Sequence, residues 1–228
     1  MCSSDLGPLP APAGRGVLVP GHGQVRVLMT TLAPGVSDVA IRVLARSGRV
    51  SAVVSDRAFD GQIPQGLDWV PQGTSPAART VVAAIPAQVT PVRLSVLAPG
   101  ADTTVKVRLI TPSGSFAPVG LTSIEAPSGV LTVVDVTKAL QGRPAVVELS
   151  ADHPIVAGAR YDLDGTGGIT EFAYAAGAPV LAGPAAAAGL PAANYRHRLY
   201  LANPDPAAAA SVRVSVIGGD GRATTTNL

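Results

Sequence analysis

Two pairs of segments in this chain match each other at a separation of about 105 residues, and this internal repeat constrains the fold more than any other feature. Residues 94–114 align with residues 199–221: each has an apolar run, an Ala-Pro or Asn-Pro pair, an alternating run and a Gly turn. Residues 19–54 align with residues 126–159. The same folding unit therefore recurs along the chain.

Within the unit the apolar residues alternate, which is typical of half-buried β-strands. Val105, Val107 and Leu109 fall on one side of such a strand, and Lys106 and Arg108 fall on the other. Alternating runs recur roughly every ten residues with turn residues between them, which favours a sandwich. The predicted fold is all-β, with tandem immunoglobulin-like antiparallel β-sandwich repeats that are truncated at both ends.

Other segments rich in Val and bounded by Gly, Pro, Asp or Ser also predict strands. These segments are residues 24–29, 39–44, 50–55, 130–135, 145–150, 155–162 and 212–216. Residues 30–34 and 136–140 each predict a single helical turn. Neither turn is long enough to cross between parallel strands, so a parallel α/β sheet is disfavoured.

The repeat divides the chain into four parts. Residues 1–6 have the sequence of a translated sequencing adapter, and residues 7–73 form the C-terminal part of a first repeat. Residues 74–182 form a complete repeat, and residues 183–228 hold a linker and the first strands of a third. The two incomplete repeats are expected to leave strand edges and apolar faces uncovered. The uncharged, proline-broken run at residues 175–193 predicts an extended linker rather than a membrane span.

Composition argues against nucleic acid as a partner. The net charge is only +2, 14% of the residues are charged, and the basic residues are scattered singly along the chain. The single cysteine, Cys2, falls in the adapter-like segment, so cysteine content does not indicate a compartment.

A partial calcium-loop motif occurs at residues 162–165, with the sequence Asp-Leu-Asp-Gly. Asp162 and Asp164 could supply carboxylate oxygens, but the position of the closing bidentate Glu is occupied by Ala173. A plain Asp-Gly hairpin turn is favoured, since Asp60-Gly61 repeats it in the preceding unit. We therefore predict no metal and no cofactor.

Trp69 is the only tryptophan and the best candidate for stacking on a sugar ring or anchoring a partner. The favoured alternative is that it packs at the seam between two repeats. Phe172 and Tyr174 occupy nearly the aligned position in the complete repeat, which supports an aromatic residue at that end of the unit.

An enzyme is the least favoured class. The chain lacks a Gly-x-Ser-x-Gly nucleophile elbow and a His-Glu-x-x-His motif. An active site would require Asp135, Glu148 and His153 to converge on one pocket. Solvated strand residues are far commoner, so no catalytic residue is predicted.

The GLDWVP sequence at residues 66–71, the two aligned segments 94–114 and 199–221, and the pattern at residues 127–140 together resemble an uncharacterised family of secreted actinobacterial proteins. The resemblance covers nearly everything after Arg15 and supplies no catalytic residues. It implies export and an envelope setting, with any export signal or membrane anchor placed before residue 7.

The expected function is therefore that of a non-enzymatic secreted or cell-envelope structural or interaction protein. Its expected partners are a cell-wall glycan or an envelope protein, together with neighbouring repeats of the same chain. One alternative is a carbohydrate-binding module for cell-wall polysaccharide, and another is a set of accessory domains of an extracellular enzyme.

Overall fold

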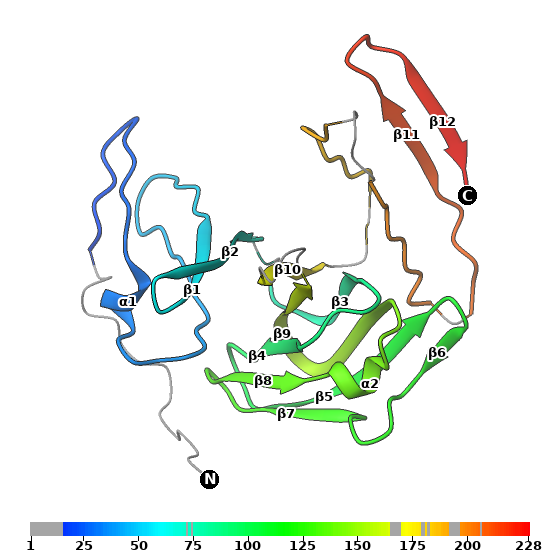
Figure 1. Ribbon diagram of the computed structural model, residues 1–228, viewed down its shortest axis with the longest axis horizontal. Coiled ribbons are helices and arrows are strands. Elements are labelled where there is room, and N and C mark those ends of the chain that lie inside the picture. The colour runs from blue at the N-terminus through cyan, green and yellow to red at the C-terminus, as the bar shows by residue number, and fades with distance from the viewer. Residues whose placement is uncertain are drawn as a thin grey trace.

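A computed structural model of the chain describes residues 16–71, 73, 75–164, 170–178, 181, 183–191, 197–205 and 207–228. The adapter-like residues 1–6 lie outside this range. The fold is all-β with antiparallel strands, as predicted. Figure 1 shows a central unit of strands, an N-terminal segment on one side of it and a C-terminal hairpin on the other.

Eight strands form the central unit. They are β3 (Ala77–Ile85), β4 (Val92–Leu97), β5 (Thr103–Thr111), β6 (Gly114–Phe116), β7 (Ser123–Ala126), β8 (Leu131–Asp135), β9 (Ala145–Asp164) and β10 (Thr170–Ala178). The first part of β9 pairs with β3 and β5, and its second part pairs with β4 and β10. One strand therefore belongs to both halves of a sandwich-like unit.

The core of this unit lies between the two halves. On β5, Val105, Val107 and Leu109 are buried while Lys106 and Arg108 are exposed, which confirms the predicted alternation. These residues join side chains of β3, β4 and β9 in one hydrophobic cluster. Burying one face of each strand supplies the main driving force for this packing.

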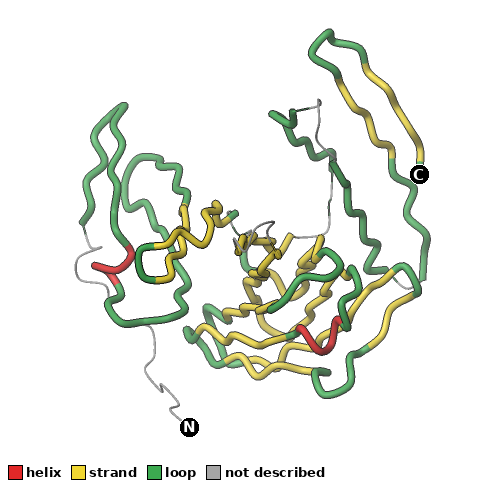
Figure 2. Tube along the Cα trace, in the orientation of Figure 1, coloured by secondary structure: helices red, strands yellow, loops and turns green. Residues whose placement is uncertain are grey.

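Both predicted helical turns are present. They are α1 (Met29–Leu32) and α2 (Thr137–Leu140), and Figure 2 shows them as short segments among strands and loops. Asp135 accepts a hydrogen bond from the Thr137 backbone N–H at 2.8 Å, and the Thr137 hydroxyl accepts one from the Val92 N–H at 2.8 Å. The turn thus ties β8 to the start of β4.

The hairpin of β1 (Val54–Asp60) and β2 (Ile63–Val70) precedes the central unit, with the Asp60-Gly61 turn between its strands. The strands predicted at residues 24–29 and 39–44 were wrong, and only the end of the segment at 50–55 becomes strand. A strand needs a neighbour for its backbone N–H and C=O groups. None pairs with residues 24–29 or 39–44 in the part of the chain that the structure describes.

At the other end, β11 (Arg213–Ile217) and β12 (Ala223–Asn227) form a hairpin that includes most of the strand predicted at 212–216. The predicted linker at 175–193 begins later than expected, because β10 continues through Ala178. Residues 183–191 are exposed and have no helix or strand. In the described ranges, no helix has the length and apolar character needed to cross a membrane.

Replacing Leu109 by Ala should lower the free energy of unfolding by about 2–5 kcal/mol, because the side chain is 1% exposed and the change leaves a cavity in the core. Lys106→Ala on the exposed face of the same strand is the control and should cost less than about 0.5 kcal/mol. Urea unfolding of the full chain measures both. Equal losses would contradict the assigned faces of β5.

Candidate functional site

The side chains that join the first hairpin to the central unit gather where β2 packs against β10. We call this contact the seam. Along β1, Val54, Asp56 and Ala58 are partly buried and the residues between them are exposed, so one face of the hairpin is turned inward. Asp68 on β2 pairs with Asp56 across the hairpin and shares that inward face. Two carboxylates therefore approach β10.

Tyr174 on β10 engages both carboxylates. Its hydroxyl donates to Asp56 Oδ2 at 2.7 Å, and its backbone N–H donates to Asp68 Oδ2 at 2.9 Å. Burial, followed by the hydrogen bond to Asp56 and the charge of that carboxylate, holds the pKa of the Tyr174 phenol well above its usual value. The hydroxyl thus remains protonated and serves as a donor across the seam.

Phe172 lies beside Tyr174 and is 3% exposed. The Arg160 guanidinium lies 4.5 Å from the centroid of the Phe172 ring, and Tyr174 meets that ring edge-on at 5.9 Å. Gly66 of β2 has φ +130°, and a Cβ at that position would lie 3.1 Å from the Phe172 ring. Only glycine combines this backbone angle with so close an approach.

Trp69 lies on the opposite, outer side of the β1–β2 hairpin and is 55% exposed. It pairs with Ser55, and Leu67 pairs with Arg57, so these four residues share what we call the outer hairpin face. Of the three aromatic residues predicted as a ligand or interface group, Phe172 and Tyr174 occupy the seam and Trp69 faces solvent.

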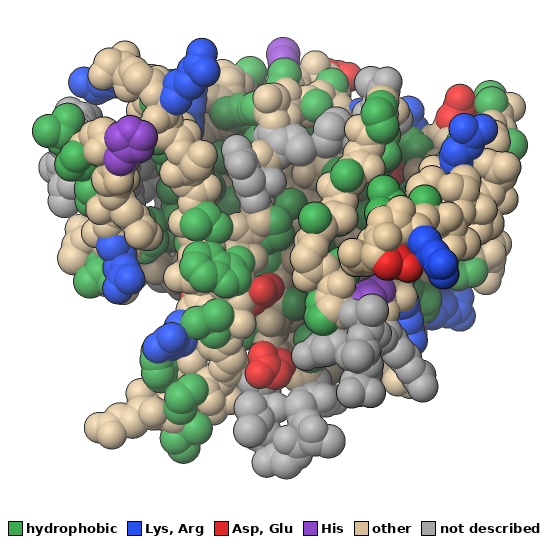
Figure 3. Space-filling model, turned by 90° about the horizontal axis from the view of Figure 1, so that it is seen from above, with side chains coloured by type: hydrophobic (Ala, Val, Ile, Leu, Met, Phe, Trp, Pro, Cys, Tyr) green, Lys and Arg blue, Asp and Glu red, His purple; other side chains and the backbone are tan. Residues whose placement is uncertain are grey.

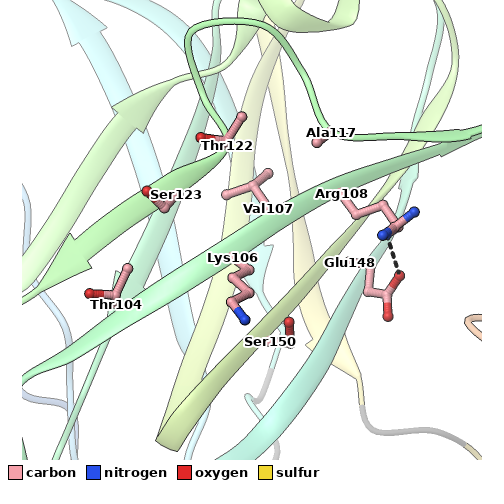
Figure 4. Close-up of a pocket in the computed structure, with 9 residues that line it drawn as sticks. All are labelled: Thr104, Lys106, Val107, Arg108, Ala117, Thr122, Ser123, Glu148 and Ser150. Carbon is pink, nitrogen blue, oxygen red and sulfur yellow. Dashed lines mark ion pairs between the residues drawn. The ribbon is translucent and has the colours of Figure 1, made fainter.

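A second polar group lies on the outside of β5 and β9, around Glu148. Figure 4 shows Arg108 directed toward the Glu148 carboxylate in a depression that Lys106 and Ser150 also line. Glu148 accepts a hydrogen bond from Arg79 Nε at 2.7 Å and lies 4.0 Å from Arg108 Nε. The carboxylate is already paired with two cations, as a buried charge requires.

The three residues considered for catalysis are not brought together. Asp135 lies across β4 from Arg160, whereas Glu148 is on the early part of β9 that pairs with β3 and β5. His153 is exposed farther along β9. The hydrogen bonds from Thr137 hold the pKa of Asp135 below its usual value, which fits a carboxylate at a turn.

The residues considered for calcium are only partly described. The Asp162 carboxylate lies 3.0 Å from the Arg160 guanidinium, which already supplies it with a cation. The side chain of Asp164 and the turn at 165–169 lie outside the described residues. Nowhere in the described part of the chain do three or more His, Cys, Asp or Glu residues form a group that could hold a metal ion.

The surface seen from above in Figure 3 has blue and red side chains scattered among apolar and neutral ones, and on the right-hand side red groups lie next to blue ones. A nucleic-acid interface would instead show clustered Lys and Arg.

A family of unknown function, DUF5719, matches residues 2–227. The chain belongs to this family. Comparison with curated proteins and with solved structures finds no similar protein. Membership of DUF5719 confirms the coarser part of the predicted resemblance, namely an uncharacterised family that spans almost the whole sequence.

Sequence patterns did not predict that two carboxylates and an arginine of this DUF5719 chain would gather at the seam. Asp56 and Asp68 stand in alternating strands whose inward face could be recognised only once β10 was known to cover it. Arg160 packs on Phe172, a contact that the sequence pattern did not predict. Its place two residues before Asp162 was the one local signal, because residues at that spacing share a face of a strand.

Tyr174→Phe should reduce the free energy of unfolding by about 1–2 kcal/mol, because it removes the hydroxyl that donates to Asp56. The folded-state pKa of Tyr174 is raised above 10.0, so this stabilisation is complete below pH 10 and is lost as the pH rises through the folded-state pKa. Urea unfolding below and above pH 10 should show the variant and the wild type converging. Tyr200→Phe is the control, and an equal loss in that variant would contradict the seam assignment.

Proposed function

We propose that this DUF5719 chain is a non-enzymatic structural and interaction protein of a secreted or cell-envelope setting, built from tandem immunoglobulin-like β-sandwich repeats. The observation that carries the proposal is the seam, where Tyr174 joins two carboxylates of the preceding hairpin to β10. A chain of units fixed in this way would act as a spacer that presents its outer strands to a partner.

The repeat interpretation is supported by elements that recur at matching positions. α1 lies inside the aligned segment 19–54 and α2 inside its counterpart 126–159, and each precedes a hairpin: β1–β2 in one case and the end of β9 with β10 in the other. β5–β6 and β11–β12 are likewise aligned hairpins. These shared elements support the repeat proposal, although residues 24–29 and 39–44 form no strands where β8 and the early part of β9 do.

Fixed spacing between units is supported by what the seam contains. Phe172 is buried against Gly66, and two hydrogen bonds from Tyr174 cross from one hairpin to the other. Contacts of this kind limit the motion that neighbouring units otherwise show. The envelope setting rests on the sequence resemblance, and fractionation of the source cells tests it, since recovery in the cytosol would contradict it.

Asp68→Ala should loosen the seam, because it removes the acceptor of the Tyr174 backbone N–H. The expected result is a larger radius of gyration in small-angle scattering of the dilute chain and faster proteolytic cleavage between β2 and β3. Asp102→Ala is the matched control, since Asp102 also accepts a backbone N–H, from Ser128 at 2.7 Å, but within the central unit. Unchanged scattering for Asp68→Ala would contradict the spacer proposal.

Carbohydrate binding is the second candidate, favoured by the exposure of Trp69 beside Leu67 and Arg57 on the outer hairpin face. An indole ring that is open to solvent can stack on a sugar ring, and a neighbouring guanidinium can bond its hydroxyl groups. The buried position of Phe172 removes it from this role, so the surface would depend on one aromatic ring.

Soluble cell-wall glycan fragments should change the fluorescence of Trp69, the only tryptophan, if this surface binds them. Calorimetry of Trp69→Ala should then show affinity reduced about tenfold or more, which corresponds to roughly 1.4 kcal/mol. Phe116→Ala, at an exposed aromatic residue on β6, is the control and should bind normally. Absence of binding by the wild type would remove this candidate and leave the spacer proposal intact.

A further inference from the structure

The outer face of the central unit carries a row of polar side chains that crosses the strands β7, β5, β9 and β3. Ser123 on β7 pairs with Lys106 on β5, which pairs in turn with Ser150 on β9. On the other edge of β9, Ser150 pairs with Arg79 on β3. Directly paired residues place their side chains on the same face of a sheet. Val107, next to Lys106, is buried in the core, so the row points away from the core.

An open depression of about 480 Å³ lies over this row, within the size range of sites that bind small molecules. It is lined by the charged groups of Lys106 and Arg108 and by the hydroxyl groups of Thr122, Ser123 and Ser150. Figure 4 shows Lys106 beside Ser150, and the second cation farther along β5. Two cations and several hydroxyl groups therefore face the same space.

The cations of this depression are not fully used by Glu148. Arg79 Nε donates to the Glu148 carboxylate at 2.7 Å, whereas Arg108 Nε lies 4.0 Å from it. The Arg108 side chain is 55% exposed, and its guanidinium has five N–H donors. The Lys106 ammonium forms no hydrogen bond or ion pair with the described residues. Since the closer cation already compensates Glu148, these two side chains can bind an anion from outside the chain.

The lining also indicates which class of anion fits. Among the described residues that line the depression none is aromatic, so it offers no ring on which a neutral sugar or a nucleic-acid base could stack. A carboxylate would pair with the guanidinium and ammonium groups. Serine and threonine hydroxyls both donate and accept, which suits the hydroxyl groups of a sugar. An acidic peptide would match the cations but leave most of these hydroxyls without partners.

We propose that this depression binds an acidic polysaccharide. One sugar carboxylate is held between Lys106 and Arg108, and neighbouring sugar hydroxyls bond Ser123 and Ser150. The surface is separate from the outer hairpin face that carries Trp69. The spacer proposal does not depend on it either, because the hydrogen bonds of the seam are formed by β1, β2 and β10.

Calorimetry of the full chain with oligogalacturonate, an oligomer of a carboxylated sugar, tests the proposal. The wild type should bind it, and the affinity should fall as salt is added because the exposed cations are then screened. A neutral malto-oligosaccharide of the same length should not bind, since it has no carboxylate. Polyglutamate of the same charge should bind more weakly, since it has no hydroxyl groups.

The double variant Lys106→Gln/Arg108→Gln removes both cations and should reduce the affinity for oligogalacturonate about tenfold or more. Arg93→Gln/Lys138→Gln is the matched control, because it removes the same charges from exposed positions on β4 and α2. Urea unfolding should show that both double variants remain folded.

Three results would overturn the proposal: no binding of oligogalacturonate by the wild type, equal losses in the two double variants, or equal affinity for polyglutamate. Asp68→Ala should bind oligogalacturonate as the wild type does, because Asp68 belongs to the seam. A failure of this proposal is therefore distinguished from a failure of the spacer proposal, which the scattering of Asp68→Ala tests.

Discussion

The pairing of β9 on both of its edges is the constraint on which the central unit depends. Its early residues pair with β3 and β5, and its later residues pair with β4 and β10. The strands of both halves of the core are therefore held in register by hydrogen bonds to one strand. Val147, Leu149, Ala157 and Ala159 place apolar groups from this strand in the same cluster. Because side chains alternate along a strand, a slip of one residue would turn all of them outward.

The same alternation explains why the outer face of β9 needs charge compensation. Glu148 stands between two core residues and must point away from the core, yet the neighbouring strands cover most of it. Arg79 on β3 and Arg108 on β5 supply cations from both sides. A buried carboxylate without such partners would be strongly unfavourable. This arrangement explains how the Glu148 carboxylate is stabilised in a buried position.

The sequence predicted those elements whose pattern lies in residues close together in the chain. It failed for those that depend on a strand partner or a contact far away in the chain. The alternation in β5 and the short turn at α2 follow from residues close together in the chain, and both are confirmed. Residues 39–44 have an equally good strand pattern but remain unpaired. At the seam, the aromatic character of Phe172 and Tyr174 was visible, whereas their contacts with Gly66, Asp56 and Asp68 span about a hundred residues and have no local pattern.

The seam and the unpaired strands are two consequences of the same chain organisation. Where a hairpin meets the next complete unit, as β2 meets β10, polar bonds and one buried ring suffice, because each side already has its own strand pairs. Residues 39–44 have no such strand pairs among the described residues, and side chains cannot replace absent backbone partners. Ile41 and Val216, on alternating apolar stretches that no further described strand covers, are 43% and 67% exposed.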